Sequence, residues 1–387
     1  MNPKEIKNKL RELKSESGSH SPSIGTMLNA IPELKIKVDA CFLSNPYATD
    51  LFIEKFNALA GSKELRDILE YYPPQNYDVA KKVSKIIKID SENIFVGNGA
   101  IEVIQAAMHN FAGKNIALPI PTFSSYYEFK RPTSNIEYYQ LDKKNNYQIN
   151  IEDYINFIKA KKCDTAILIN PNNPTGEFVS TNSIKHFLNS LKDLDLIIID
   201  ESFIHFAYED DDFKLAQNES LIYQYPNLII IKSMSKDFGI AGIRAGYGIM
   251  NKDRVKQLVS NGYLWNVSGL CDYFFSTYGE TEFQEKYEQE RKRYILDTIS
   301  FIDDLNKIVG IKVYQTKANF VLIEILSNQI SSFDMVVELL VDKGIYIRDC
   351  ADKIGLNGEF VRIASRSKDE NIIIIQAIKD FANQHLS

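Results

Sequence analysis

The stretch from residue 228 to residue 244 reads LIIIKSMSKDFGIAGIR. Its first four residues are aliphatic and typical of a strand buried on both faces, whereas the serines and glycines that follow are typical of a turn. This turn holds the amine of Lys236, the hydroxyls of Ser233 and Ser235 and, eight residues after the lysine, the guanidinium of Arg244. A single lysine is most often a solvated surface residue. In this setting it also suits a nucleophile that forms a Schiff base, with Arg244 available for a phosphate.

Four further apolar runs precede this stretch and share its character. They are IFVG (94–97), IALPI (116–120), TAILIN (165–170) and LIIID (196–200). Helical patterns lie between several of these runs. After FVGNG, for example, apolar residues recur at helical spacing at Ile101, Ile104, Met108 and Phe111. Short buried strands that alternate with amphipathic helices predict an α/β fold, in which helices wrap a mostly parallel sheet.

A second, smaller α/β unit is predicted towards the C-terminus. The runs ANFVLIEIL (318–326), IYIRDC (345–350) and FVRIAS (360–365) have strand character, and a helix is expected at about 332–343. Ser367 and Glu370 have the spacing of a capping box, which predicts that a last helix begins there.

The first 22 residues are expected to form a polar arm. Ile6, Leu10 and Leu13 could begin a helix, but the serines, glycine and proline between residues 15 and 22 are expected to break it. We therefore divide the chain into three parts. Residues 1–48 form the arm and part of a small domain, 49–265 a large cofactor-binding domain, and 266–387 a linker helix with the rest of the small domain.

Composition excludes several classes of function. The net charge of -6 over 387 residues disfavours nucleic acid as a partner, because binding to the phosphate backbone needs a concentrated basic face. The four cysteines have no metal-ligand spacing, so no metal site is expected, and they suit reduced core thiols in a cytoplasmic protein. The charged N-terminal sequence does not resemble a secretory signal, and no apolar run is long enough to span a membrane.

Polar residues follow three of the predicted strands at their carboxyl ends, where open α/β sheets bind ligands. In GNGAIE, Gly99 and Ala100 begin a helix whose free N–H groups could hold a phosphate, although a packing turn fits the pattern equally well. The loop Asn170–Gly176 combines two prolines and a glycine with three amide side chains. Asp200 ends the run LIIID, and a carboxylate is costly to bury there without a cationic partner. A protonated pyridine nitrogen would supply that charge.

Together these motifs resemble the fold-type I pyridoxal phosphate enzymes of the class I and II aminotransferase superfamily, over nearly the whole chain. The resemblance implies pyridoxal 5'-phosphate as the cofactor, a sheet of the seven-stranded type in the large domain, and a homodimer with shared active sites. It implies Lys236 as the Schiff-base lysine, Asp200 on the pyridine nitrogen and Asn173 on the 3'-oxygen. It also assigns Phe123, in PTFSSY, to stacking on the cofactor ring. The residues implied for the cofactor phosphate are Gly99, Ala100, Ser233, Ser235, Arg244 and, from a second subunit, Tyr47.

Arg348 in IYIRDC and Arg362 in FVRIAS are the expected substrate-binding residues. A single strand arginine is commonly a surface residue, but the pair resembles a subgroup in which one arginine binds the substrate carboxylate and the other helps to bind a phosphate ester. That subgroup includes histidinol-phosphate aminotransferase and L-threonine O-phosphate decarboxylase. His20, in SHSPS, lies where the decarboxylase has a histidine that contacts the substrate phosphate, although a histidine in a polar arm is usually just solvated.

The two members of this subgroup imply different reactions. Residues 348–367 and the run DESFIHF (200–206) resemble the decarboxylase, and Phe203 replaces the tyrosine of the DEAY motif found in most aminotransferases of the group. The sequence SNPYA around Tyr47 resembles the aminotransferases instead. We expect decarboxylation of O-phospho-L-serine or O-phospho-L-threonine to ethanolamine phosphate or aminopropanol phosphate. Transamination of a phosphorylated substrate is the alternative.

Some transcription regulators carry an aminotransferase-like domain that senses a ligand without turnover. Such proteins have a DNA-binding domain in addition, and no basic winged-helix segment precedes the predicted fold in this sequence. An enzyme is therefore expected.

Overall fold

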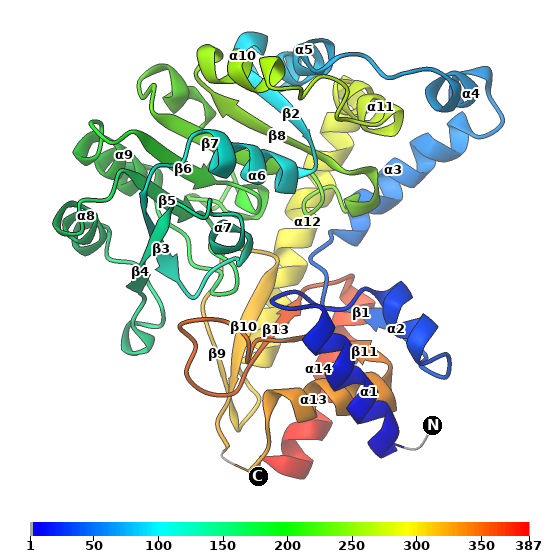
Figure 1. Cartoon of the computed structure of the whole chain (residues 1–387). Helices are drawn as coiled ribbons and strands as arrows, with labels where there is room; N and C mark the ends of the chain where they lie inside the picture. Colours follow the sequence, from blue (N-terminus) through cyan, green and yellow to red (C-terminus); the bar gives the residue numbers. More distant parts are fainter. Residues whose placement is uncertain (1–2, 328, 387) are drawn as a thin grey trace. The chain divides into compact units, whose positions relative to one another are not determined.

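The computed structural model describes residues 3–327 and 329–386 (Figure 1). Contacts divide the chain into two units. The large unit comprises Ser44–Asn173 and Glu177–Tyr294, and the small unit comprises the chain up to Leu43, Pro174–Gly176 and the chain from Ile295 onward. The sequence-based boundaries after residues 48 and 265 differ from these, because residues 44–48 and 266–294 both pack with the large unit.

The large unit is built on a seven-stranded sheet whose strand order is β2-β8-β7-β6-β5-β3-β4. Neighbouring strands from β7 to β4 run parallel, whereas β8 is antiparallel to both β7 and β2. The predicted mostly parallel sheet is therefore confirmed. The strands are β2 (Ile94–Asn98), β3 (Asn115–Ile120), β4 (Asn135–Gln140), β5 (Thr165–Ile169), β6 (Leu196–Asp200), β7 (Leu228–Ser233) and β8 (Ala245–Met250).

Both faces of this sheet are buried, which explains why its strands are almost entirely aliphatic. Along β6, Ile197 and Ile199 belong to one hydrophobic cluster, whereas Leu196 and Ile198 belong to a second cluster. Side chains alternate between the two faces of a strand, so two cores form, one on each side of the sheet. The helices of this unit are α3 (Pro46–Leu59), α4 (Lys63–Glu70), α5 (Asn76–Ile87), α6 (Ala100–Asn110), α7 (Ser125–Glu128), α8 (Ile151–Ala160), α9 (Thr181–Ser190), α10 (Lys252–Ser260) and α11 (Gly269–Tyr278).

The small unit contains an antiparallel sheet with the strand order β12-β13-β10-β9 and a parallel pair formed by β1 and β11. Helix α12 (Thr281–Leu305) begins in the large unit and ends in the small one. The remaining elements are α1 (Pro3–Glu16), α2 (Ile24–Ala30), β1 (Val38–Asp39), β9 (Ile311–Val313), β10 (Phe320–Ile325), α13 (Ser332–Glu338), β11 (Ile345–Tyr346), β12 (Arg348–Asp349), β13 (Phe360–Ala364) and α14 (Lys368–His385).

The structure revises two expectations for the small unit and confirms a third. IYIRDC forms two short strands in different sheets, because Ile345 and Tyr346 pair with β1 whereas Arg348 and Asp349 pair with β13. The helix expected at 332–343 is α-helical only to Glu338 and continues as one π-helical turn. The capping box at Ser367 is confirmed, since Ser367 and Glu370 exchange hydrogen bonds at the start of α14.

The prediction of a polar arm at the N-terminus was wrong. Residues Pro3–Glu16 form the helix α1, and Ile6, Leu10 and Leu13 are buried against the small unit. The breaking residues follow the helix and end it, with Gly18 in the left-handed region at φ +57°. An apolar stripe with a tertiary partner therefore outweighs the polar residues around it.

All four cysteines are buried, as expected of core residues. None of the helices in the described part of the chain combines the length and apolar character that crossing a membrane requires.

Candidate active site

The predicted cofactor residues gather at one edge of the large sheet. Strands β3, β5, β6 and β7 run parallel and end there, and the pairing through β8 gives β2 the same direction. Strand β8 runs the other way and therefore begins at this edge, directly after Arg244. Across the sheet, the edge carries in order Gly99, Arg244, the turn Ser233–Lys236, Asp200, Asn170–Asn173 and Phe123.

Lys236 lies in the tight turn that follows β7. Its backbone carbonyl accepts hydrogen bonds from Asn45 N at 2.9 Å and from Gly239 N at 3.3 Å. The side-chain amide of Asn45, which also caps helix α3, donates to the carbonyl of Asp237 at 3.1 Å. The turn is thus held at Lys236 and at the residue after it, which limits the movement of the backbone from which the lysine side chain leaves.

The corner between α6 and β8 brings together groups that can bind an anion. Helix α6 begins immediately after Gly99, whose φ of +75° favours glycine, and its first N–H groups lie at the sheet edge. Arg244 donates from Nη1 to Ala241 O at 3.0 Å and from Nη2 to Asn98 O at 3.4 Å. Arg244 itself has a φ of +60°, a left-handed conformation that costs on the order of 1–3 kcal/mol and is often found at functional sites.

Close packing at this corner depends on two glycines. A Cβ added to Gly246 would lie 2.4 Å from Ala100 N, so a side chain on β8 would push α6 away from the sheet. A Cβ added to Gly99 would lie 2.4 Å from Nη2 of Arg244. Ser233 and Ser235 are buried beside this corner at the end of β7, where Ser233 Oγ accepts from Ser235 N at 3.3 Å.

Asp200 ends β6 and is only 3% exposed. Its Oδ2 accepts from the hydroxyl of Tyr126 at 2.7 Å, and its Oδ1 accepts from Ser202 N at 2.8 Å. Burial raises the pKa of this carboxyl despite both hydrogen bonds. A cation next to it would restore the ionised form, which is what a protonated ring nitrogen offers.

The loop after β5 is held from both sides. Asn170 exchanges hydrogen bonds with the backbone of Val179, and Asn172 accepts from the hydroxyl of Thr122 at 2.8 Å. Asn173, the residue predicted to bind the 3'-oxygen, is buried at the end of this loop. Phe123 follows Thr122 and is partly buried, with one side packed on the hydrophobic cluster that contains Ile169.

Tyr47 lies in the first turn of α3 and is half-buried. Its ring packs edge-on against Tyr294 at 5.9 Å between centroids, and the guanidinium of Arg293 lies 4.2 Å from the ring centroid. Its predicted role in a second subunit stays a prediction.

A buried charge network lies directly beside the turn of Lys236. Asp237 Oδ2 accepts from Lys232 Nζ at 3.0 Å and is 2.7 Å from His205 Nδ1, which is also 2.9 Å from the hydroxyl of Tyr287. Although burial would raise the pKa of Asp237, Lys232 and His205 hold it at about 2. Burial and the nearby Lys232 lower the pKa of His205 to about 4, so the imidazole is neutral at pH 7. Lys232 and Asp237 form the ion pair of this network.

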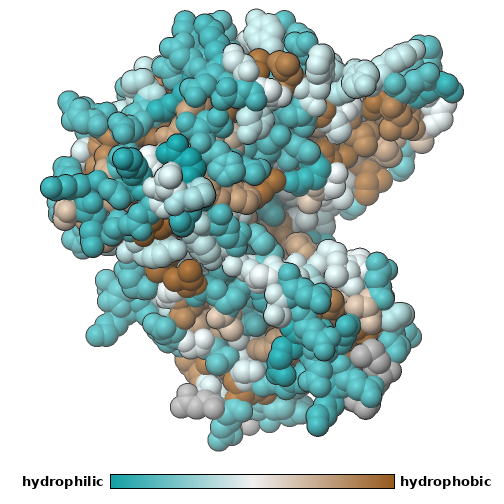
Figure 2. All heavy atoms as spheres, in the orientation of Figure 1, coloured by the Kyte–Doolittle hydropathy of each residue, from teal (hydrophilic) through white to brown (hydrophobic). Residues whose placement is uncertain are grey.

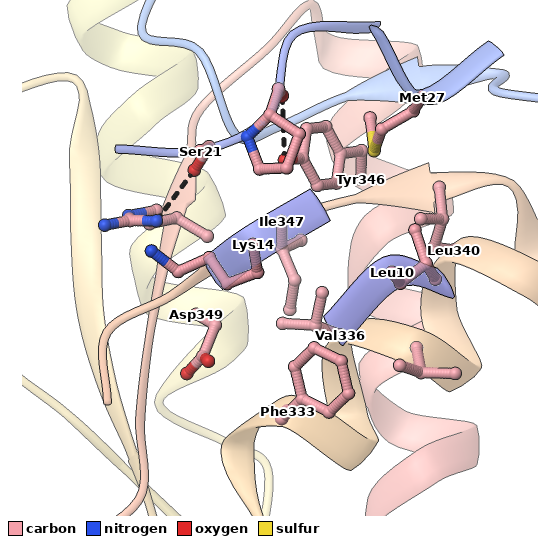
Figure 3. Close-up of a pocket in the computed structure, with 13 residues that line it drawn as sticks. Leu10, Lys14, Ser21, Met27, Phe333, Val336, Leu340, Tyr346, Ile347 and Asp349 are labelled. Carbon is pink, nitrogen blue, oxygen red and sulfur yellow. Dashed lines mark hydrogen bonds between the residues drawn. The ribbon is translucent and has the colours of Figure 1, made fainter. Parts of the chain in front are cut away.

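The small unit carries the two predicted substrate arginines on adjacent strands. Arg348 on β12 and Arg362 on β13 are directly opposite each other in the antiparallel register, and both are buried. Arg348 donates to both carboxylate oxygens of Asp352, at 2.7 and 3.0 Å, and to the carbonyl of Ser19 at 2.8 Å. It also donates to Ser21 Oγ at 2.9 Å, the bond drawn as a dashed line at Ser21 in Figure 3.

The connection between α1 and α2 is ordered by these contacts. Lys14 donates to the carbonyls of Gly18 and His20 and to Asp352, each at 2.8 to 2.9 Å. Figure 3 shows Lys14 and Ser21 beside a small hollow of about 30 Å³, which is otherwise lined mainly by apolar side chains of α1, α13 and β11. His20 itself is exposed. The structure thus places His20 on the segment that Arg348 holds, and its proposed contact with substrate stays a prediction.

The edge of the large sheet fits pyridoxal 5'-phosphate. The helix start at Gly99, the guanidinium of Arg244 and the two serines after β7 form a cradle for a phosphate. Asp200 is a buried carboxylate whose ionised form a cation would stabilise. Lys236 supplies an amine after β7, which lies between the phosphate cradle and Asp200 in the sheet.

Comparison with known proteins decides the family. The family model described as "Aminotransferase class I and II" matches residues 42–378. This chain belongs to the class I and II aminotransferase family. As a member of that family, it is a pyridoxal 5'-phosphate-dependent enzyme.

Within the class I and II aminotransferase family, the chain is similar to named decarboxylases. It is 52% identical to an L-serine phosphate decarboxylase of Campylobacter jejuni, over 97% of each chain. It is 42% identical to an L-serine phosphate decarboxylase of Sulfurospirillum multivorans, over 95% of this chain and 94% of the relative. A solved decarboxylase structure from Sulfurospirillum multivorans has a TM-score of 0.92 and 40% identity, over 97% of this chain and 96% of the other. A histidinol-phosphate aminotransferase of Methanococcus aeolicus is 30% identical over 98% of this chain and the full length of the relative.

Several residues of this family member were missed by sequence reasoning. Tyr126 is separated from Asp200 by 74 positions, so their hydrogen bond has no local signal. Lys232, Asp237 and His205 lack any recognisable spacing, although a lysine inside the apolar strand LIIIKS could have drawn attention, because a buried ammonium needs a partner. A lysine close to Arg348, Lys353, was also missed.

Proposed function

We propose that this protein is a decarboxylase that converts O-phospho-L-serine to ethanolamine phosphate and carbon dioxide. The observation that carries the proposal is the buried cross-strand pair Arg348 and Arg362, in a chain that is 52% identical to an L-serine phosphate decarboxylase. Two buried guanidinium groups suit a substrate with two acidic groups, a carboxylate and a phosphate ester.

The proposed roles of the chain's own groups follow from where they lie. Lys236 Nζ binds the cofactor and can carry a proton to or from the substrate α-carbon. Asp200, supported by Tyr126, holds the proton on the ring nitrogen, and Arg348 and Arg362 bind the acidic groups of the substrate. The chemistry that pyridoxal phosphate supplies when bound is withdrawal of the electron pair left on the α-carbon.

The reaction needs no second substrate. The bond between the α-carbon and the carboxylate breaks, carbon dioxide leaves, and a proton takes its place on the α-carbon. There is no net oxidation or reduction, and no amino-group acceptor is consumed. This balance separates decarboxylation from transamination, in which the amino group must pass to a keto acid.

The test is to mix the purified holoenzyme with O-phospho-L-serine, without any keto acid, and to follow the products by phosphorus and proton NMR. We expect catalytic formation of ethanolamine phosphate. O-Phospho-L-threonine is expected to react more slowly, because one methyl group is worth about 1 to 3 kcal/mol of discrimination. A protein that turns over only after 2-oxoglutarate is added would be an aminotransferase instead.

That aminotransferase is the second candidate. The 30% identity to a histidinol-phosphate aminotransferase favours it, as does Tyr47 in the SNPYA motif. In the same NMR experiment, O-phospho-L-serine without a keto acid would then give no product. Glutamate supplied with imidazole acetol phosphate would give histidinol phosphate.

We also propose that the protein is a homodimer whose subunits share active sites, with Tyr47 acting in the neighbouring subunit. Several large apolar side chains of the large unit are exposed, and Tyr72 is 90% exposed. Figure 2 shows apolar atoms gathered over α3 and α4. Exposed apolar patches on a soluble protein often mark an interface. The exposed residues are Ile53, Leu69, Tyr71, Tyr72, Tyr77 and Trp265.

A further inference from the structure

The small unit buries three cationic side chains close to one another. Arg348, Arg362 and Lys353 are 4%, 9% and 7% exposed, respectively. Arg348 and Arg362 are cross-strand partners, and like charges directly opposite each other destabilise a sheet. Buried cations in proteins are normally paired with anions. Three buried cations this close together are therefore expected to have acidic groups nearby.

Two carboxylates lie on the segment that carries Arg348 and Lys353, and both already have other partners. Asp352 accepts from Arg348 with both oxygens and also pairs with Lys14 at 2.8 Å. Asp349, the other carboxylate on this segment, accepts instead from the hydroxyl of Ser332 at 2.8 Å. Asp352 is therefore already shared between the cations Arg348 and Lys14, and it does not pair with Lys353.

Lys353 has no carboxylate within ion-pair distance among residues 3–327 and 329–386. Its Nζ lies 3.4 Å from the carbonyl oxygen of Ser19, the same atom to which Arg348 donates at 2.8 Å. Two cations thus converge on one neutral acceptor. Burial, with Arg348 next in effect, lowers the pKa of Lys353 to about 8. An anion bound between these groups would reverse that effect and favour the charged amine.

We propose that Lys353 is a specificity-determining residue that binds the phosphate ester of the substrate beside the Arg348–Arg362 pair. The inference deepens the proposed function and rests on it for the identity of the substrate. A phosphate dianion carries twice the charge of a carboxylate and has three free oxygens, so it can engage a third cation that an unphosphorylated amino acid cannot. Lys353 thereby distinguishes phosphorylated from plain amino acids.

The first experiment measures binding of orthophosphate to the holoenzyme by isothermal titration calorimetry. The cofactor fills its own phosphate site in the holoenzyme, so orthophosphate reports the small unit. We expect Lys353→Met to weaken binding by about tenfold or more and Lys353→Arg to restore it to within about threefold. Lys343→Met is the matched control, because Lys343 is an exposed lysine of the same unit, paired with Asp380. Equal affinity in the wild type and Lys353→Met would overturn the proposal.

The second experiment uses pH. Orthophosphate is mostly a dianion above about pH 8, so its own charge changes little at higher pH. We expect its affinity for the wild type to fall as pH rises from about 8 to 9.5, because Lys353 loses its proton, and Lys353→Met to lack this fall. The charged and titratable groups around Lys353 are Arg348 on β12, Arg362 on β13, Asp352 and Cys350 on its own loop, and Lys14 and His20 on the α1–α2 segment. Cys350 has its pKa raised to about 11 by burial, which keeps it out of this window.

Steady-state kinetics separate this inference from the proposed function. With O-phospho-L-serine, Lys353→Met is expected to raise KM about tenfold with kcat changed by less than about threefold. If the wild type does not act on O-phospho-L-serine, the proposed function fails, while the orthophosphate measurements still decide the role of Lys353. If the wild type is active and Lys353→Met keeps its KM but melts at a lower temperature, Lys353 only fastens Ser19 and the inference fails.

Discussion

The carboxylate of Asp200 links cofactor binding to ionisation at a single residue. It is buried at the end of β6, and burial raises its pKa even though Tyr126 and Ser202 donate to it. The ionised form becomes favourable when a positive charge lies against it. A bound, protonated pyridine ring would provide that charge, so that the cofactor and the carboxylate would stabilise each other's charged state.

Tyr126→Phe tests this arrangement. Removal of the hydroxyl leaves Asp200 Oδ2 without its donor, which we expect to cost about 1 to 3 kcal/mol. The variant should melt at a lower temperature and release pyridoxal phosphate more readily in dialysis. Tyr138→Phe is the control, because it removes the same hydroxyl from an exposed ring on β4. Equal cofactor retention in Tyr126→Phe and the wild type would show that this hydrogen bond has no role in holding the cofactor.

Lys236→Ala is expected to abolish turnover, because the amine that binds the cofactor is lost. The visible absorbance of the purified protein should disappear with it. Both effects can be followed in one sample, by spectrophotometry and by NMR of the products. Retained activity in this variant would contradict the assignment of the whole site.

Residues that follow a strand could be predicted from the sequence, and residues that act across the fold could not. Asp200 and Lys236 follow apolar runs, and a polar group at the carboxyl end of a parallel strand is in the position where such sheets bind ligands. Tyr126 and Lys353 gain their roles only from partners that the fold brings to them. Lys353 in particular resembles an ordinary surface lysine until its burial is known.

At the scale of elements, β7 and the turn after it depend on a buried proton-sensitive network. His205 is neutral in the folded protein, surrounded by Lys232, Asp237, Tyr287 and Arg291. The unfolded chain protonates this histidine near pH 6.5, but the folded protein does so only near pH 4. The unfolded state therefore binds one more proton between these values. The contribution of His205 to stability is fully present above pH 6.5 and is lost as pH falls towards 4.

This gives a prediction for acid stability. Between pH 6.5 and pH 4, His205 should account for a loss of up to about 3 kcal/mol in the free energy of unfolding. His205→Asn keeps a donor for Asp237 and cannot titrate, so its stability should fall less steeply with pH. Urea unfolding at pH 7, 5.5 and 4.5, followed by circular dichroism, compares the two proteins. Parallel curves for both would show that His205 does not titrate in this window.

Helix α1 is expected to stabilise the small unit. Leu10 is buried between α1 and the segment around Leu340. Leu10→Ala should reduce the free energy of unfolding by about 2 to 5 kcal/mol, the usual cost of a cavity in a core. Leu28→Ala on the neighbouring helix α2 is the control, since Leu28 is 37% exposed. Thermal melting of both variants checks the prediction, and similar melting temperatures would mean that α1 packs only weakly.

Elements with an internal pattern could be predicted, and elements that depend on a partner could not. The strands of the large sheet are buried on both faces, so their aliphatic runs are unmistakable. Helix α1 was missed because its three apolar residues stand among lysines and glutamates, and only packing against the small unit makes the helix stable. IYIRDC was taken as one strand because nothing in six residues shows that two different partners divide it.

At the scale of the whole molecule, the proposed homodimer can be tested through the exposed residues at and just after the end of α4. Leu69→Lys combined with Tyr72→Lys places two charges on residues that are 68% and 90% exposed. We expect the dimer to dissociate at least tenfold more readily, because charges would have to be desolvated in the interface. Analytical ultracentrifugation gives the dissociation constant. Ile372→Lys on α14, an apolar residue exposed to 58%, is the control, and a wild type that sediments as a monomer would refute the dimer.

The strand order of the large sheet has a consequence for how the protein is made. Strand β2 leaves the ribosome first among the seven, yet its neighbour β8 is the last to be translated. A nascent chain that stops before Arg244 therefore holds β2 with its backbone groups unmatched, and it lacks the bond from Gly99 N to Arg244 O at the corner between α6 and β8. Unmatched strands invite contact with other chains during synthesis. We therefore expect the proposed cofactor site to be completed only after β8 has been made, and the interval before that to be the one in which the nascent chain is most prone to aggregate.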